Sequence, residues 1–274
     1  MPELPEVETV RRGLNRLVKG ATIASVEVRW PRIVNNDVDR FKARLVNATI
    51  EKVDRRGKYL LFRFNHGLTM VSHLRMEGKY NVMPKDEGQT KHTHVIFHLT
   101  DQRDLLYNDT RKFGRMTLVP TGEETTVGGL KTMGPEPIDS ALTMAYLTAV
   151  LAKSKKMIKP FLLDQSKIAG IGNIYADETL WLSKIHPMRP ANSLTETEIA
   201  ALRQNIIAEM ALAIKGHGTT VHSFSTAFGE AGQFQNQLHV YGREGEPCER
   251  CGTLIEKIKV AQRGTHFCPH EQRL

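Results

Sequence analysis

Short runs in which apolar residues alternate with polar ones, or predominate over them, fill the first half of the chain. Turn residues separate these runs, a pattern that favours an all-β sandwich or barrel over alternating strands and helices. Before them, Val7, Val10, Leu14 and Leu17 recur at helical spacing and predict an N-terminal helix that ends near Gly20. We expect strands at residues 26–30, 49–53, 59–64, 68–73, 79–83, 94–99, 105–107 and 115–119.

The second half of the chain has helical periodicity instead. A glycine- and proline-rich stretch, residues 128–137, marks the change and indicates a linker. The clearest helix begins at Thr195, which forms a capping-box pattern with Glu198, and it ends before Gly216. Helices are expected at residues 142–151, 158–163, 174–182 and 195–214. The fold class that follows is α+β, with a β-sandwich domain first and a helical domain second.

Composition adds a class of partner to this outline. The chain has 274 residues, 40% of them hydrophobic, and a formal net charge of +8. That positive charge favours a polyanionic partner, although charge alone does not distinguish DNA, RNA and a membrane surface. No apolar run approaches the roughly 20 residues of a membrane span, and the acidic N-terminus is not typical of a signal peptide. We therefore expect a cytoplasmic protein.

The N-terminus offers an unusual nucleophile. Removal of Met1 would leave Pro2 with a secondary amine beside the carboxylate of Glu3. An α-amino group has a reference pKa of about 8, so a useful fraction of it is unprotonated near neutral pH. A secondary amine that condenses with a sugar aldehyde gives an iminium cation, which acts as an electron sink. Prolines such as Pro2 and Pro5 also commonly do no more than begin a helix, and the stretch alone favours that simpler interpretation.

Cysteines near the C-terminus suggest a metal site. Cys248 and Cys251 form a Cys-x-x-Cys pair, and Cys268, after sixteen intervening residues, is followed by His270 and Glu271. Three cysteines, an odd number, suit a metal site better than a disulfide framework. Two knuckles at this separation are a strong zinc signal when four cysteines are present. Here Glu271 stands where the fourth would be.

Six sequence blocks, in the same order along nearly the whole chain, resemble the bacterial formamidopyrimidine-DNA glycosylase family. They are residues 2–9, 55–58, 73–78, 111–114 and 170–175 and the C-terminal cysteine module. The resemblance implies an N-terminal β-sandwich domain over residues 1–133, a helix-two-turn-helix domain over 134–232 and a zinc-finger-like β-hairpin over 233–274. The stretch 216–235 aligns with the family's loop that closes over the everted base. The sister endonuclease VIII family shares this plan but typically has glycine in place of Leu4.

The resemblance also implies roles for single residues. Pro2 corresponds to the nucleophile that forms a Schiff base, and Glu3 to the group that moves protons at the sugar. Lys58 and Arg263 correspond to cations that contact phosphate near the lesion and assist the β- and δ-eliminations. Positions that match the family's DNA contacts are Met76, His92, Arg111, Phe113, Lys155 and Asn173.

Three of these contacts, Met76, Arg111 and Phe113, match the trio that fills the hole left by the everted nucleotide. By pattern alone, a methionine or phenylalanine beside a strand is more typical of a core. Lys155 belongs to a basic cluster, residues 153–159, that could equally be a solvated helix face.

For the C-terminal module, the resemblance implies one structural zinc ion bound by Cys248, Cys251 and Cys268. Ligand chemistry favours His270 as the fourth ligand, whereas the knuckle spacing favours Glu271. A metal-free finger held by its hairpin packing stays open as a third arrangement. No redox cofactor or catalytic metal is implied.

These residues together predict a bifunctional DNA glycosylase and abasic-site lyase. Its substrate would be damaged double-stranded DNA that carries oxidised purines such as 8-oxoguanine and formamidopyrimidines. Two alternatives stay open, an endonuclease VIII-like glycosylase for oxidised pyrimidines and a non-catalytic DNA-binding protein. Intact Pro2, Glu3 and Lys58 count against the second, because a binding protein needs none of them. We expect a monomer in the cytoplasm, on the nucleoid and without a membrane partner, although the sequence itself does not reveal the oligomeric state.

Overall fold

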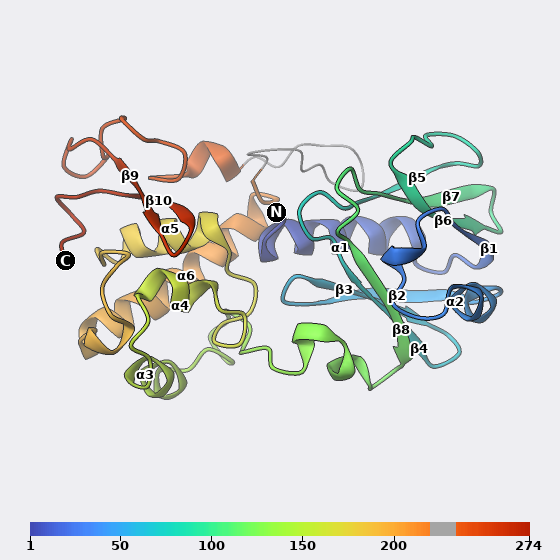
Figure 1. Cartoon of the computed structure of the whole chain (residues 1–274), viewed down its shortest axis with the longest axis horizontal. Helices are drawn as coiled ribbons and strands as arrows, with labels where there is room; N and C mark the ends of the chain where they lie inside the picture. The colour runs from blue at the N-terminus through green and yellow to red at the C-terminus, as the bar shows by residue number, and fades with distance from the viewer. Residues whose placement is uncertain (220–233) are drawn as a thin grey trace. The chain divides into compact units, whose positions relative to one another are not determined.

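The computed structural model describes residues 1–219 and 234–274 and divides the chain into two compact units (Figure 1). The first unit comprises Met1–Lys131 and Gly216–Gln233, and the second comprises Thr132–Lys215 and Phe234–Leu274. The N-terminal blocks of the sequence therefore lie in the first unit, and the glycine-rich turn and cysteine module lie in the second.

The first unit is a sandwich of two antiparallel four-stranded sheets. One sheet has the strand order β1-β6-β7-β5, and the other has the order β2-β3-β4-β8. The strands are β1 (Ile23–Val28), β2 (Ile50–Arg56), β3 (Tyr59–Phe64), β4 (Leu68–His73), β5 (Lys79–Pro84), β6 (Thr93–Leu99), β7 (Arg103–Asn108) and β8 (Arg115–Pro120). The helices and short 3-10 turns are α1 (Leu4–Val18), α2 (Val38–Leu45), η1 (Pro31–Ile33), η2 (Glu124–Thr126) and η3 (Gly128–Leu130).

Alternating side chains of the two sheets form the core of this unit. Leu60 and Phe62 of β3 belong to the same buried cluster as Val95 and Phe97 of β6. Residues two apart on a strand face the same side, so each sheet presents one apolar face to the other. The apolar stripe of α1 joins the cluster through Leu14, which is fully buried. Helix α1 is therefore fixed to the sandwich along its length.

Besides the long connection from β1 to β2, the chain crosses from one sheet to the other at two neighbouring loops. The first leads from β4 to β5 and the second from β7 to β8. The residues that flank the loops pair with one another, His73 with Arg115 and Lys79 with Asn108. Both loops therefore begin and end at paired positions at one end of the sandwich.

The second unit consists of helices and a C-terminal hairpin. Its elements are α3 (Met144–Ala152), α4 (Ile158–Leu163), α5 (Asn173–Leu182), η4 (Ala191–Ser193), α6 (Glu196–Lys215), η5 (Phe234–Gln237), β9 (Glu256–Val260) and β10 (Arg263–Phe267). A capping box begins α6, because the Thr195 N–H donates to Glu198 Oε2 at 2.8 Å and the Glu198 N–H donates to Thr195 Oγ1 at 3.3 Å. The hairpin turns through Ala261 and Gln262, both with positive φ, so Arg263 lies at its tip.

The predicted α+β fold class is confirmed, with local differences. The first strand is Ile23–Val28 rather than 26–30, because Pro31 has no N–H to donate and begins a 3-10 turn instead. The helix expected from residue 142 begins at Met144, after the N-cap Thr143. Helix α2 was not located from the sequence. No helix in the described part of the chain is long and apolar enough to cross a membrane.

Two carboxylates are buried together in the second unit, on α5 and α6. Glu178 accepts the backbone N–H groups of His239, Val240 and Tyr241 at 2.7, 3.0 and 2.7 Å. Glu209 has one oxygen, Oε1, without a hydrogen-bond partner among the described residues. Burial, followed by the charge of Glu178, raises the pKa of Glu209 from 4.5 to about 7.

We expect Glu209→Gln to stabilise the protein above neutral pH. A carboxyl whose pKa is raised on folding contributes stability below its unfolded pKa of 4.5, and the contribution is lost as pH rises through the folded pKa of about 7. Glutamine carries no charge, so the variant should melt at least about 2 °C above the parent near pH 8. The two proteins should melt together near pH 4.5. An equal difference at both pH values would show that ionisation of Glu209 is not the cause.

Candidate functional site

The N-terminal residues are enclosed by the first unit. Met1 is exposed, whereas Pro2 and Glu3 are buried. Glu3 is the N-cap of α1 and forms a capping box with Glu6, whose Oε2 accepts the Glu3 N–H at 2.7 Å. The other oxygen of Glu6, Oε1, accepts the N–H of Thr219 at 2.8 Å. Glu6 therefore joins the start of α1 to the segment that follows α6.

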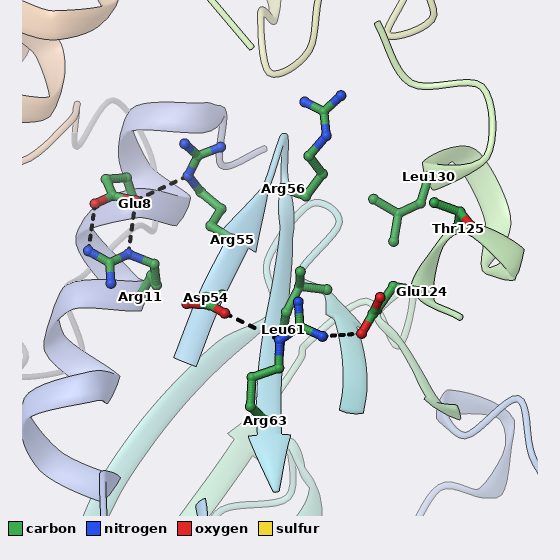
Figure 2. Close-up of a pocket in the computed structure, with 10 residues that line it drawn as sticks. All are labelled: Glu8, Arg11, Asp54, Arg55, Arg56, Leu61, Arg63, Glu124, Thr125 and Leu130. Carbon is green, nitrogen blue, oxygen red and sulfur yellow. Dashed lines mark hydrogen bonds and ion pairs between the residues drawn. The ribbon is translucent and has the colours of Figure 1, made fainter. Parts of the chain in front are cut away.

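Polar contacts set the register of α1 against β2. Asn15 Oδ1 accepts the Val53 N–H at 2.9 Å, and the Arg11 guanidinium donates to the Val53 carbonyl at 3.4 Å. Closer to the N-terminus, Glu8 accepts from Arg11 at 2.8 Å and from Arg55 at 3.1 Å (Figure 2). Residue numbers fall along α1 as they rise along β2, so the N-terminus approaches the β2–β3 turn. That turn carries the predicted catalytic lysine.

Glu8 is ionised near neutral pH. Burial raises the pKa of this carboxyl, but hydrogen bonds from Arg11 and Arg12 and the charges of Arg11 and Arg55 outweigh burial and lower the pKa to about 2. The ion pairs that hold α1 on β2 are therefore complete near neutral pH.

A cavity of about 610 Å³ lies beside this contact, lined by residues of α1, β2, β3 and the η2–η3 segment (Figure 2). Arg63 spans it and forms ion pairs with Asp54, at 3.2 Å, and with Glu124. On the opposite wall, Arg11 and Arg55 hold Glu8. The lining has four arginines and three carboxylates, and these ion pairs brace the strands below the turn.

Lys58 is buried, with 4% of its surface exposed, in the turn between β2 and β3. It lies near His73, whose pKa is lowered to about 3 by burial and by the charges of Arg75 and Lys58. His73 is therefore neutral, and its Nδ1 accepts the Arg75 N–H at 2.9 Å. Its ring packs edge-on against Tyr59, with centroids 4.5 Å apart. The turn therefore places a buried lysine close to a neutral imidazole.

The predicted hole-filling residues lie on the two crossover loops. Met76 is 37% exposed and Phe113 is 47% exposed. The Arg111 guanidinium lies 4.8 Å from the centroid of the Phe113 ring, in cation–π geometry. His92 is half-buried, and its carbonyl accepts the Asp109 N–H at 2.9 Å at the base of the second loop. These side chains are presented to solvent rather than packed in the core.

The second unit brings Asn173 and the tip of the hairpin together. Asn173 is the first residue of α5, after the glycine-rich turn, and its side-chain amide donates to the Gly264 carbonyl at 3.0 Å. Arg263, next to Gly264, is exposed. Lys155 is also exposed, in the loop between α3 and α4. The N-terminus of α5, with Asn173 and the neighbouring hairpin tip, is suited to phosphate.

Within the basic cluster at residues 153–159, Lys153, Lys155 and Lys156 are exposed, and Lys159 is buried. Lys159 is fully buried, with its Nζ 2.6 Å from Asp177 Oδ1, and it donates to the Gly264 carbonyl at 2.9 Å and to Thr265 Oγ1 at 2.8 Å. Asp177 Oδ2 in turn accepts the His266 N–H at 2.9 Å. This buried ion pair therefore ties the hairpin to α4 and α5.

The cysteine module places three thiols in one cluster. The Sγ atoms of Cys248, Cys251 and Cys268 lie within 4.8 Å of one another, and the last two are 3.5 Å apart. Ligand atoms of His270 and Glu271 form a second such set with Cys251. Zinc–sulfur bonds of about 2.3 Å in a tetrahedron place sulfur atoms about 3.8 Å apart. The three thiols therefore fit a zinc ion.

The fourth position has two candidates in different surroundings. The Glu271 carboxylate forms ion pairs with Lys184 at 3.0 Å and with Arg250 at 3.6 Å. His270 is exposed, and its Nδ1 lies 3.9 Å from Glu271 Oε1.

Comparisons with known proteins cover nearly the whole chain. Family models match residues 1–116 (formamidopyrimidine-DNA glycosylase N-terminal domain), 133–225 (formamidopyrimidine-DNA glycosylase H2TH domain) and 245–270 (zinc finger found in FPG and IleRS). A formamidopyrimidine-DNA glycosylase of Lactiplantibacillus plantarum is 84% identical over the full length of both chains, and one of Pediococcus pentosaceus is 62% identical over the same span. The chain belongs to the formamidopyrimidine-DNA glycosylase family.

Solved structures of the family agree with the fold described above. A Lactococcus lactis FPG mutant in complex with DNA containing Fapy-dG is 44% identical, with a TM-score of 0.95 over all of both chains. A complex of Lactococcus lactis Fpg with DNA containing an abasic site has a TM-score of 0.94, at 44% identity over 99% of this chain and 100% of the other.

Two predictions remain, the zinc site and the loop that closes over the everted base. The zinc-finger model covers all three cysteines and His270, and the thiol geometry fits the structural zinc that was expected. The predicted base-closing loop, in contrast, is described only at its ends. Thr220, His222 and Phe224 lie outside the described residues.

Proposed function

We propose that this protein repairs DNA by excising oxidised purines from damaged duplexes and cleaving the abasic site that remains. Its relatives are formamidopyrimidine-DNA glycosylases, and its structural neighbours were solved with DNA containing Fapy-dG or an abasic site. One observation carries the proposal for this chain: Pro2 and Glu3 are buried at the start of α1. The ion pair of Glu8 with Arg55 holds this end of α1 beside the turn that contains Lys58.

In the first chemical step, the Pro2 nitrogen, once Met1 is removed, attacks C1′ of the everted nucleotide. The bond from C1′ to the base breaks, and the base leaves with the electron pair and a proton. Glu3 supplies and accepts protons at the sugar as the ring opens to an iminium between Pro2 and C1′. The N-terminal end of α1 carries a partial positive charge that favours the ionised carboxylate at this point.

The iminium then drives two eliminations. It acidifies the 2′ hydrogen, so loss of that proton breaks the C3′–O bond, and a second elimination breaks the C5′–O bond. Each departing phosphate takes up developing negative charge, which a fixed cation stabilises without reorganisation. We assign this role to the buried Lys58 and to Arg263 at the hairpin tip.

DNA binding uses both units in this proposal. His92 and Lys155 contact the DNA backbone. Met76 and Phe113 occupy the space of the everted nucleotide, which recovers part of the few kcal/mol lost on unstacking. Arg111 offers donors to the orphaned cytosine.

The three predicted domains have different roles in this proposal. Residues 1–133 carry out the chemistry, residues 134–232 bind the DNA backbone, and residues 233–274 position Arg263. A protein with these tasks acts on the nucleoid in the cytoplasm.

Replacement of Asn173 or Arg263 by alanine is expected to weaken binding to every duplex, damaged or not. Each phosphate neutralised by a cation accounts for about one unit of the slope of log K against log salt, so Arg263→Ala should flatten that slope by about one unit. Asn173→Ala removes a neutral donor and should weaken binding without changing the slope. Asn173 also donates to the Gly264 carbonyl, so its loss should loosen the tip that carries Arg263. The effects of the two replacements should therefore be less than additive. A parental salt slope in Arg263→Ala would remove Arg263 from the phosphate contacts, and parental affinity in Asn173→Ala would remove Asn173.

We propose that zinc is bound by Cys248, Cys251, Cys268 and His270. Glu271 Oε2 already forms ion pairs with Lys184 and Arg250, and imidazole is the better ligand beside three thiolates. When bound, zinc fixes the hairpin that carries Arg263.

Metal analysis of protein purified without added zinc is expected to find about one zinc per chain. His270→Ala should lose much of it, and Glu271→Gln should keep it. Only a small fraction of one zinc in the parent would favour a metal-free finger, and unchanged zinc in His270→Ala would move the assignment to Glu271 or water.

The specificity is tested with a panel of otherwise identical duplexes. One carries 8-oxoguanine opposite cytosine, a second carries thymine glycol opposite adenine, and a third is undamaged. We expect excision and strand cleavage mainly of the first. Preference for thymine glycol would indicate an enzyme for oxidised pyrimidines, and binding without cleavage of either would indicate a non-catalytic DNA-binding protein.

A further inference from the structure

The two crossover loops, here called the Met76 loop (residues 74–78) and the Phe113 loop (residues 109–114), are bracketed by paired strands. His73 pairs with Arg115 on one side, and Lys79 pairs with Asn108 on the other. The loops therefore leave and rejoin the sandwich together, although 30 or more residues separate them in sequence.

Asp109 closes the Phe113 loop. It is almost fully buried, its Oδ1 accepts the Arg111 N–H at 3.0 Å, and its Oδ2 accepts the Gly114 N–H at 2.8 Å. The Asp109 carbonyl also accepts from the His94 ring at 2.8 Å and from the Lys112 N–H at 3.3 Å. One carboxylate thus bonds both sides of the loop whose outer residues are Arg111 and Phe113.

Tyr107 fills the space between the two loops. A Cβ added at Gly114 would lie 1.6 Å from its hydroxyl oxygen, and a Cβ added at Gly78 would lie 2.3 Å from it, so only glycine fits at either position. The hydroxyl donates to Asp109 Oδ2 at 3.4 Å. Glu77 of the Met76 loop also accepts a hydrogen bond from the Thr110 hydroxyl. Both loops therefore pack against the hydroxyl group of Tyr107.

Two further features stabilise the Tyr107 contact and the Phe113 loop. Burial, together with the charge of Asp109, raises the pKa of Tyr107, so its hydroxyl stays protonated and remains a donor. Lys112, in the left-handed conformation at φ 57°, places its ammonium 4.1 Å from the centroid of the Trp30 ring. The outer part of the Phe113 loop is thereby fastened to the sandwich.

We propose that Met76 and Phe113 enter DNA as one rigid wedge, and that Tyr107 and Asp109 are the positioning residues that hold its two loops together. This inference rests on the proposed function, in which both side chains fill the space of the everted nucleotide. Two independent loops would each lose conformational freedom on insertion, whereas a preformed wedge has already lost that freedom on folding. Neither Tyr107 nor Asp109 touches DNA in this account.

The rigid wedge is tested first in the free protein with Asp109→Asn. Asparagine has the same shape, but its NH₂ group would face one of the two loop N–H donors. Asp104→Asn is the matched control, because Asp104 is a buried carboxylate of β7, the strand that precedes Asp109, and it bonds His98 and the Asp86 N–H instead. Amide hydrogen exchange of Gly78, which bonds the Leu74 carbonyl and not Asp109, reports on the other loop.

We expect at least about tenfold faster exchange at Arg111, Gly114 and Gly78 in Asp109→Asn, the effect of losing a hydrogen bond to a charged group, and no change at these amides in Asp104→Asn. Faster exchange confined to the Phe113 loop would overturn the proposal, because the loops would then be independent.

Activity supplies the second test. Asp109→Asn should lower kcat for excision of 8-oxoguanine from duplex DNA by at least about tenfold. It should leave cleavage of a preformed abasic site in single-stranded DNA unchanged, since no stacked base must be replaced there. Equal losses on both substrates would overturn the positioning role in favour of general damage to the fold. If the parent protein itself excises nothing, the proposed function fails, and hydrogen exchange still decides whether the loops form one unit.

Discussion

Protein that retains Met1 is expected to bind damaged duplex DNA with unchanged affinity and to have no glycosylase or lyase activity. In that form, the Pro2 nitrogen is part of a peptide bond, and its lone pair is delocalised into the carbonyl. A delocalised nitrogen cannot attack C1′, so the whole contribution of covalent catalysis is lost. Met1 is exposed at the end of the chain, so its presence should not disturb the fold.

The comparison uses two preparations of the same chain, one with Met1 retained and one from which an aminopeptidase has removed it. Mass spectrometry gives the fraction of each form, and cleavage of 8-oxoguanine duplex gives the activity. Activity should be proportional to the fraction that begins at Pro2. Full lyase activity in protein shown to keep Met1 would refute the assignment of Pro2.

Glu3→Gln is expected to lower the rate of base excision by at least about 100-fold, the usual contribution of a general acid or base. Glutamine has nearly the same shape and keeps an oxygen that can serve the capping box with Glu6. Helix α1 should therefore stay in place, and DNA binding should be unchanged. The loss would then reflect the missing proton transfer at the sugar.

Glu27→Gln makes the same chemical change on β1, where the carboxylate is exposed and paired with Arg29 at 2.7 Å. That variant should excise 8-oxoguanine at the parental rate. Melting temperatures of both variants should lie within a few degrees of the parent. Excision by Glu3→Gln at the rate of Glu27→Gln would remove Glu3 from the mechanism.

Periodicity alone was sufficient to predict most of the secondary structure. The capping box of Thr195 and Glu198 is local in sequence, and it appears where the pattern placed it. Helix α2 was missed although Val38, Phe41 and Leu45 lie at helical spacing after the N-cap Asp37. Eight residues give too few periods for such a pattern to be distinguished from a loop.

The residues that order the site could not have been found from the sequence. Arg55 meets Glu8 across 47 positions of the chain, and Lys159 meets Asp177 only because α4 and α5 pack together. Lys159 was grouped with solvated lysines, since its neighbours are basic and exposed and its partner is distant. A charge pattern records which residues are near in sequence, whereas burial is decided by tertiary packing.

Borohydride trapping with an 8-oxoguanine duplex tests the central claim most directly. Reduction of the iminium turns a transient Schiff base into a stable amine, which links protein and DNA covalently. The account predicts an adduct of one chain with one DNA strand, and peptide mapping should place the link on the nitrogen of Pro2. Glu3→Gln should trap little from the same duplex. The absence of any covalent adduct from active protein, or an adduct on a lysine such as Lys58, would contradict the mechanism.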